Sequence, residues 1–141
     1  MIIGAICIIA GGLVSAVTAS VPSQAAAWTV AYLVLVSGVA QLALGLGQSA
    51  LAAVPSWRLI GLELATFNLG NLAVMVGTLV RMPLVVDVGG VLLLVALALF
   101  IWGVRGSSSR ARVVLYGYRF VTLVLLVSIP IGLALAHIRA A

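Results

Sequence analysis

The sequence contains very little charge. Only 6% of its 141 residues are charged, whereas roughly a quarter are charged in water-soluble domains. It has no lysine, so all seven basic residues are arginine. Hydrophobic residues make up 65% of the chain, and the mean hydropathy is +1.41. This composition predicts a membrane protein and argues against a nucleic-acid-binding surface, because basic residues are not interleaved with exposed aromatics.

Cysteine and histidine occur only once each, as Cys7 and His137. One cysteine cannot form an intrachain disulfide, and one histidine cannot form a bis-histidine haem site or a multi-histidine metal site within the chain. The absence of lysine excludes a phosphate-binding glycine loop that ends in lysine. The only acids, Glu63 and Asp87, are expected near opposite membrane faces. We therefore expect neither an enzyme activity nor a cofactor.

Apolar runs of about 20 residues, the length that crosses a bilayer as a helix, account for nearly the whole sequence. Short turns that contain Pro22, Pro55 and Pro83 separate several of them. The expected fold is all-α: a polytopic membrane protein with a single transmembrane domain built as a five-helix bundle. The predicted spans are residues 2–20, 25–47, 57–81, 84–104 and 113–137.

The arginines predict the orientation of these spans. Basic residues are enriched in short cytoplasmic loops. The side that holds the N-terminus receives four arginines, at positions 58, 105, 110 and 112, and the opposite side receives Arg81 and Arg139. This difference predicts that the N-terminus is cytoplasmic and the C-terminus lies outside.

The first span carries small residues at every fourth position, which suits close packing between membrane helices. The predicted helix-packing seam consists of Cys7, Gly11, Ser15 and Ala19. A cleaved signal peptide is the alternative, because the sequence up to Ala19 could serve as a cleavage site. The lack of a basic region before the apolar run argues against that alternative.

The third span is the one whose polar residues need an explanation. Glu63 and Asn71 share one face of the predicted helix. Residues 59–66 and 115–122 share the pattern Leu-x-Gly-x-(charge)-x-x-Thr, which is either chance or the trace of a duplicated two-helix hairpin. In either case Glu63 and Arg119 enter the membrane at nearly the same depth, about 10 Å.

Gln41 of the second span is expected at that depth too. We therefore predict an intramembrane polar layer that contains Gln41, Glu63 and Arg119, with Asn71 deeper on the Glu63 face. Arg119 can neutralise Glu63 as a structural ion pair, and the alternative is that Glu63 has a role in transport.

Two charged residues flank the turn before the fourth span. Arg81 and Asp87 are expected to form an ion pair on the outer face, as a topological anchor. His137 at the outer end of the fifth span is expected to act as an interfacial cap and not as a metal ligand.

Two classes of function fit these features. The first is an accessory or scaffold subunit that packs in the bilayer with itself, as a homo-oligomer, or with a larger membrane-protein complex. The alternative is a transporter coupled to protons or a small solute, which uses Glu63 with Gln41 and Asn71. The expected location is the cell (inner) membrane, and the arginine-only, alanine-rich and valine-rich composition is associated with a GC-rich bacterial source.

Overall fold

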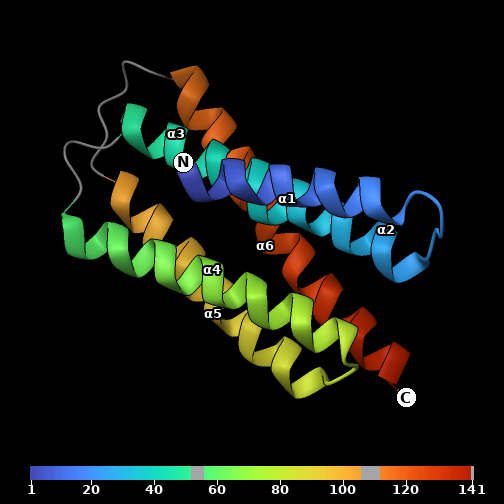
Figure 1. Cartoon of the computed structure of the whole chain (residues 1–141). Helices are drawn as coiled ribbons and strands as arrows, with labels where there is room; N and C mark the ends of the chain where they lie inside the picture. Colours follow the sequence, from blue (N-terminus) through green and yellow to red (C-terminus); the bar gives the residue numbers. More distant parts are fainter. Residues whose placement is uncertain (52–55, 106–111, 141) are drawn as a thin grey trace. The chain divides into compact units, whose positions relative to one another are not determined.

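The computed structural model describes residues 1–51, 56–105 and 112–140, with side chains as far as Ile138. In these ranges the chain is helical and contains no strand, so the all-α prediction is confirmed. A π-helix, η1, joins α2 to α3 without a break (Figure 1). The helices are α1 (Ile2–Thr18), α2 (Gln24–Ala31), η1 (Tyr32–Ala40), α3 (Gln41–Leu51), α4 (Trp57–Leu79), α5 (Pro83–Val104) and α6 (Arg112–Ala140).

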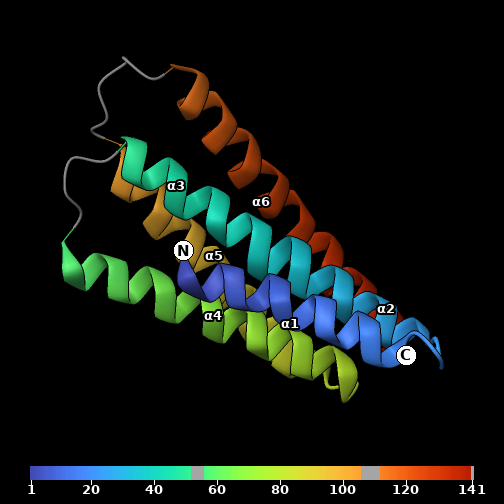
Figure 2. The same cartoon turned by 45° about the horizontal axis from the view of Figure 1, so that its top comes forward.

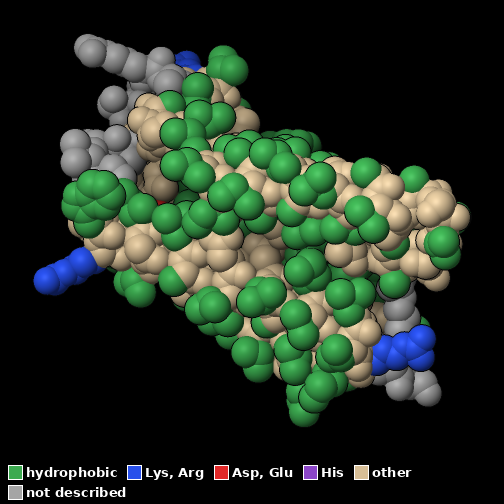
Figure 3. All heavy atoms as spheres, viewed as in Figure 1, with side chains coloured by type: hydrophobic (Ala, Val, Ile, Leu, Met, Phe, Trp, Pro, Cys, Tyr) green, Lys and Arg blue, Asp and Glu red, His purple; other side chains and the backbone are tan. Residues whose placement is uncertain are grey.

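Four of these helical stretches are long and apolar enough to cross a membrane: Gln24–Leu51, which combines α2, η1 and α3, then α4, α5 and Arg112–Ile138 of α6. Helix α1 is apolar but shorter, with 17 residues. Hydrophobic side chains cover much of the visible helix surface in Figure 3, and basic side chains stand near helix ends. The four apolar helices indicate a membrane-embedded protein, because lipid is the solvent that such surfaces favour.

The chain divides into two compact units, Met1–Gly45 and Leu46–Ala141. Helix α3 begins in the first unit and ends in the second. The prediction of one transmembrane domain is not decided by this division.

In the first unit, α1 packs against the following helical stretch through glycines, and Figures 1 and 2 both show α1 beside it. A Cβ atom added to Gly4 would lie 2.9 Å from the carbonyl oxygen of Gly38, and one added to Gly11 would lie 2.6 Å from Cγ2 of Val34. Both contacts are therefore too close for any residue with a side chain to fit unchanged. The two helices approach each other at small residues, as membrane helices commonly do.

The face of α1 that packs within this unit includes only part of the predicted seam, and the seam as an interface with another chain stays a prediction. Gly11 is buried and Cys7 is half-buried, but Ser15 and Ala19 are exposed. The reason is geometric: at 100° per residue, each step of four residues turns the side chain by 40°. A strict four-residue spacing therefore leaves the packed face after two steps, whereas the spacing between Gly4 and Gly11 stays on it.

In the second unit, α4 and α5 form a tight antiparallel hairpin, visible in Figures 1 and 2. A Cβ on Gly89 of α5 would lie 2.7 Å from the backbone nitrogen of Val74 and 2.8 Å from the carbonyl oxygen of Gly70. One on Gly77 would lie 2.8 Å from the backbone nitrogen of Val86. The helices α4 and α5 thus touch through their backbones at these glycines.

The turn between α4 and α5 closes this hairpin. Arg81 has φ 56°, the left-handed conformation that normally favours glycine at this position. The backbone N–H of Met82 donates to the carbonyl of Gly77 at 2.8 Å, and that of Arg81 donates to Thr78 at 3.4 Å, as in a Schellman motif. Pro83 is the first residue of α5, as predicted.

We expect Arg81→Gly to stabilise the protein by about 0.5–1 kcal/mol, because glycine adopts the left-handed conformation without strain. Arg81→Ala is the matched control, since it removes the same charge and keeps the strained Cβ. The midpoint of unfolding in SDS titrations should rise for the glycine variant only. Equal midpoints for the two variants would show that the backbone at Arg81 stores no strain.

Candidate functional site

The carboxylate of Glu63 is the most deeply buried ionisable group described in the second unit. Glu63 lies in the second turn of α4, whose first turn is capped by Ser56: the Ser56 hydroxyl accepts from the backbone N–H of Leu59 at 3.3 Å. The side chain of Glu63 points into the unit, and the residue is 1% exposed. A carboxylate at such a position needs hydrogen-bond partners, because no water can reach it.

Gln48 of α3 supplies that partner. Its amide nitrogen Nε2 donates to both carboxylate oxygens of Glu63, at 2.8 Å to Oε1 and 2.9 Å to Oε2. Gln48 is itself 6% exposed. An ionised carboxylate can only accept hydrogen bonds, so the nitrogen and not the oxygen of the amide must face it.

Two glycines make room for this contact. A Cβ on Gly103 of α5 would lie 2.6 Å from Nε2 of Gln48 and 3.1 Å from Oε1 of Glu63. A Cβ on Gly47, next to Gln48, would overlap the ring of Tyr118. Helices α3, α5 and α6 can therefore approach the Glu63 side chain only because these two positions lack a side chain.

Tyr118 completes the site from α6. Its ring is 4% exposed, and its hydroxyl donates to the backbone carbonyl of Phe100 on α5 at 2.8 Å. Phe100 in turn makes an edge-to-face contact with Phe67, one turn after Glu63, with 6.1 Å between ring centroids. We call Gln48, Glu63 and Tyr118 the Glu63 cluster; its residues come from α3, α4 and α6, and the Tyr118 hydroxyl connects it to α5.

The structure does not bring Arg119 to Glu63. Arg119 is exposed, and no ion pair joins the two residues, both of which the structure describes. The inward positions of α6 are Tyr118, Thr122 and Leu125, and Arg119 lies one residue, or 100°, away from them. Equal depth in the membrane does not fix the direction in which a side chain points, so the alignment of Glu63 with Arg119 does not by itself bring their charges together.

The other two residues of the predicted polar layer lie elsewhere. Asn71 is buried on the same face of α4 as Glu63, as predicted, and its Nδ2 donates to the carbonyl of Phe67 at 2.9 Å. Gln41 is 2% exposed and belongs to the first unit, whereas Glu63 belongs to the second. A layer that contains both Gln41 and Glu63 stays a prediction.

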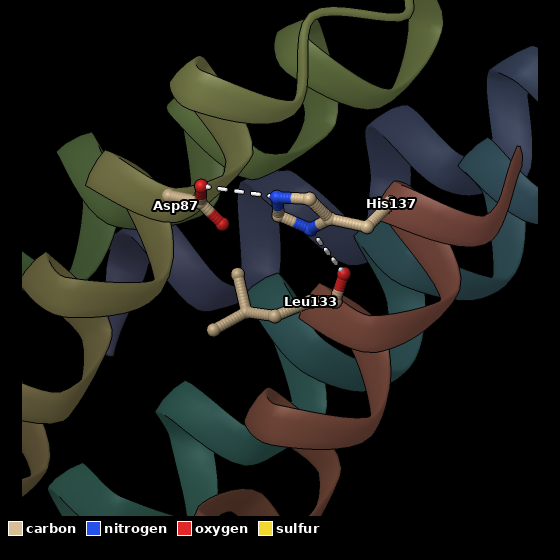
Figure 4. Close-up of polar contacts among 3 residues, drawn as sticks. All are labelled: Asp87, Leu133 and His137. Atoms are coloured by element: carbon tan, nitrogen blue, oxygen red, sulfur yellow. Dashed lines mark hydrogen bonds and ion pairs between the residues drawn. The ribbon is translucent and has the colours of Figure 1, made fainter. Parts of the chain in front are cut away.

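Asp87, which was predicted to pair with Arg81, lies next to His137. Asp87 Oδ2 lies 3.4 Å from Nε2 of His137, and the two side chains are drawn in Figure 4. Arg81 is exposed and makes no ion pair with any residue that the structure describes. The left-handed turn at Arg81 precedes α5 and does not bring its side chain onto Asp87. Sequence reasoning missed the partner because His137 is fifty positions further along the chain.

In the described ranges, histidine, cysteine, aspartate and glutamate side chains nowhere gather in groups of three. We therefore assign metal ligands to none of them. No protein-family model matches the chain, and the comparisons find neither a similar curated protein nor a similar solved structure. The class that the fold and site define is a multi-helix membrane protein with a carboxylate buried among its helices.

Proposed function

We propose that this protein carries out proton-coupled transport, with Glu63 as the proton-binding group. The observation that carries the proposal is the partner of Glu63: a carboxylate that is 1% exposed is held by a neutral amide and not by an arginine. Ionisable groups inside membrane bundles are costly and commonly mark proton or ion pathways. Without a cation to balance it, the charge of Glu63 is most simply removed by a proton.

Gln48 is suited to both protonation states of Glu63. Its NH₂ group donates to the carboxylate in the geometry described above. After rotation of the amide, its carbonyl oxygen can accept a hydrogen bond from the protonated carboxylic acid. The side chain therefore supports uptake and release of a proton without leaving Glu63 unpaired in either state.

The proposed topology has five spans, with the N-terminus in the cytoplasm. The close packing of α1 along Val34 and Gly38 supports α1 as a span, because its partner stretch is long enough to cross the bilayer. At 17 residues, α1 extends about 26 Å, slightly less than the hydrocarbon core. The excess of arginines on the N-terminal side supports the orientation; of these residues, Arg110 lies outside the described ranges.

The same proposal places the protein in the cell (inner) membrane of a bacterium, without a cofactor and without enzyme activity. One histidine, one cysteine and two acids leave few groups for catalysis. A homo-oligomer is the simplest assembly in which five short spans enclose a pathway.

The test of the proposal is proton movement in proteoliposomes that contain the purified protein and a trapped pH-sensitive dye. Under an imposed membrane potential, we expect proton uptake in the wild type and none above the rate of empty liposomes in Glu63→Gln. Thr66→Val is the matched control, because Thr66 lies one turn further on α4 and its hydroxyl donates only to its own helix. Equal rates in the wild type and Glu63→Gln would rule out Glu63 as the proton site.

A second function, that of an accessory subunit, is favoured by Arg119. Its side chain is exposed on a helix that can cross the membrane, about 10 Å along the helix from Arg112. An acidic group of another membrane protein would pair with it there. This function predicts a partner that co-purifies with the wild type in mild detergent, and no proton uptake by the protein alone.

A further inference from the structure

The contact between Asp87 and His137 joins the beginning of α5 to the end of α6. Figure 4 shows the two side chains pointing toward each other from their helices, with the Leu133 carbonyl on the other side of the ring. Nε2 of His137 lies 3.4 Å from Oδ2 of Asp87, and Nδ1 lies 3.0 Å from the Leu133 oxygen. Both ring nitrogens are therefore occupied by oxygen atoms of the protein.

Both of these oxygen atoms can only accept hydrogen bonds. The Leu133 carbonyl has no proton to donate, and an ionised carboxylate has none either. A neutral imidazole carries one N–H and could satisfy only one of the two contacts. Both contacts are favourable at once when His137 carries a proton on each nitrogen, that is, as an imidazolium beside the Asp87 carboxylate.

The helix that carries His137 favours the charge on its ring. His137 lies in the last turn of α6, where the helix dipole stabilises a cation, whereas Asp87 lies just beyond the first turn of α5 and gains little from the dipole of that helix. Among the described residues, Asp87 is the charged group that faces His137; Arg81, in the turn before α5, makes no ion pair. The side chains are 56% and 38% exposed for His137 and Asp87, so water can deliver a proton.

The pair of Asp87 and His137 suits a proton better than a metal ion. A zinc ion in a protein takes three or four protein ligands, and this pair offers two side chains. No third histidine, cysteine, aspartate or glutamate joins the pair within the described ranges. The chemistry of the site therefore selects a proton.

The pair lies far from the Glu63 cluster on the same helices. Gly103, which touches Glu63 and Gln48, is close to the C-terminus of α5, and Asp87 is close to its N-terminus. At 1.5 Å per residue, the two positions are about 24 Å apart along α5. That distance approaches the thickness of the hydrocarbon core of a bilayer, roughly 30 Å.

We propose that Asp87 and His137 form a second proton-binding site, at the membrane face opposite to the Glu63 cluster. The proton comes from water on that face, adds to the unprotonated ring nitrogen of His137, and returns to water when the ring is deprotonated. When the ring is protonated, the ion pair between His137 and Asp87 holds the end of α6 against the beginning of α5. The role of this site as the outer end of a proton pathway rests on the proposed function of Glu63, whereas proton binding itself does not.

The sole histidine makes a direct test possible. In protein labelled with ¹⁵N-histidine and reconstituted in nanodiscs, the ring nitrogen signals come from His137 alone. At one pH, kept the same for both proteins, we expect a larger doubly protonated fraction in the wild type than in Asp87→Asn, because only the wild type keeps the carboxylate beside the ring. Glu63→Gln, which removes the only other acid, is the matched control and should leave the ring signals unchanged.

Three results would overturn the second site: a wild-type ring with one protonated nitrogen down to pH 5, a ring unaffected by Asp87→Asn, or a ring altered equally by Glu63→Gln. The first needs no variant, so it can be obtained even if Asp87→Asn does not fold. The two proposals fail separately. Absent proton uptake together with the expected ring signals would overturn transport and leave the second site standing.

Discussion

Gly89→Ala is expected to destabilise the protein by about 1–3 kcal/mol, the usual cost of forcing an extra methyl group into a well-packed interior. The new Cβ would lie 2.7 Å from the backbone nitrogen of Val74 and 2.8 Å from the carbonyl oxygen of Gly70. A side chain in its way could change rotamer, but a backbone can move only if the whole helix moves. Helices α4 and α5 must therefore separate, and the contacts around their crossing weaken together.

Gly61→Ala is the matched control for this substitution. Gly61 lies in α4, and a Cβ there would meet nothing within 4 Å. Because alanine is a better helix former than glycine, this variant should be neutral or more stable by up to about 1 kcal/mol. The midpoints of SDS-induced unfolding of the two variants should lie on opposite sides of the wild-type value, or the control should coincide with it. A loss of stability that is equal in both would show that the backbone contact at Gly89 is not what holds the hairpin.

The positions of the helices could be predicted from the sequence because the bilayer sets both their length and their composition. In the structure, Pro83 begins α5 and Ser56 caps α4, close to the predicted ends of these spans. The number of spans depends on α1, because this helix has only 17 residues and is shorter than the four helical stretches that are long enough to cross a membrane. The π-helix from Tyr32 to Ala40 has no signal in the hydrophobic pattern, because it changes the hydrogen bonding of the backbone and not the composition.

The candidate site could be predicted only in part. Glu63 was found because a carboxylate in an apolar run is rare and costly. Gln48 was not found as its partner. The match between residues 59–66 and 115–122 placed Glu63 and Arg119 at the same depth in the membrane, but it did not show in which direction each side chain points. Gln48 shares a helix face with Gln41 in the sequence, but no pattern distinguishes a glutamine that binds a carboxylate from one that does not.

The glycine contacts illustrate the same limit. Gly103 opens the space in which Gln48 meets Glu63, whereas Gly117 and Gly132 face open space. In the sequence these residues look alike, because a glycine shows only that a side chain is absent. Whether a glycine allows a close contact depends on which helix packs against it. The residues of that helix lie far away along the chain.

Gln48→Leu is expected to destabilise the protein by about 1–3 kcal/mol, because it leaves a buried carboxylate without its hydrogen-bond donor. Leucine is close to glutamine in size, so the change removes the amide and creates little empty space. The carboxylate of Glu63 then has no other donor among the described residues. Unfolding in SDS, followed by tryptophan fluorescence, measures the effect.

Two comparisons separate the lost hydrogen bond from lost packing. In Gln48→Leu with Glu63→Leu, both polar partners are gone, so the double variant should regain most of the stability that Gln48→Leu loses. Gln41→Leu is the matched single control: Gln41 lies in the same helix α3, it is 2% exposed, and neither atom of its amide group has a hydrogen-bond partner among the described residues. Removing an unpaired buried amide should be neutral or stabilising. If the double variant were as unstable as the sum of the two single variants, or Gln41→Leu as harmful as Gln48→Leu, the contact between Gln48 and Glu63 would not be what stabilises the cluster.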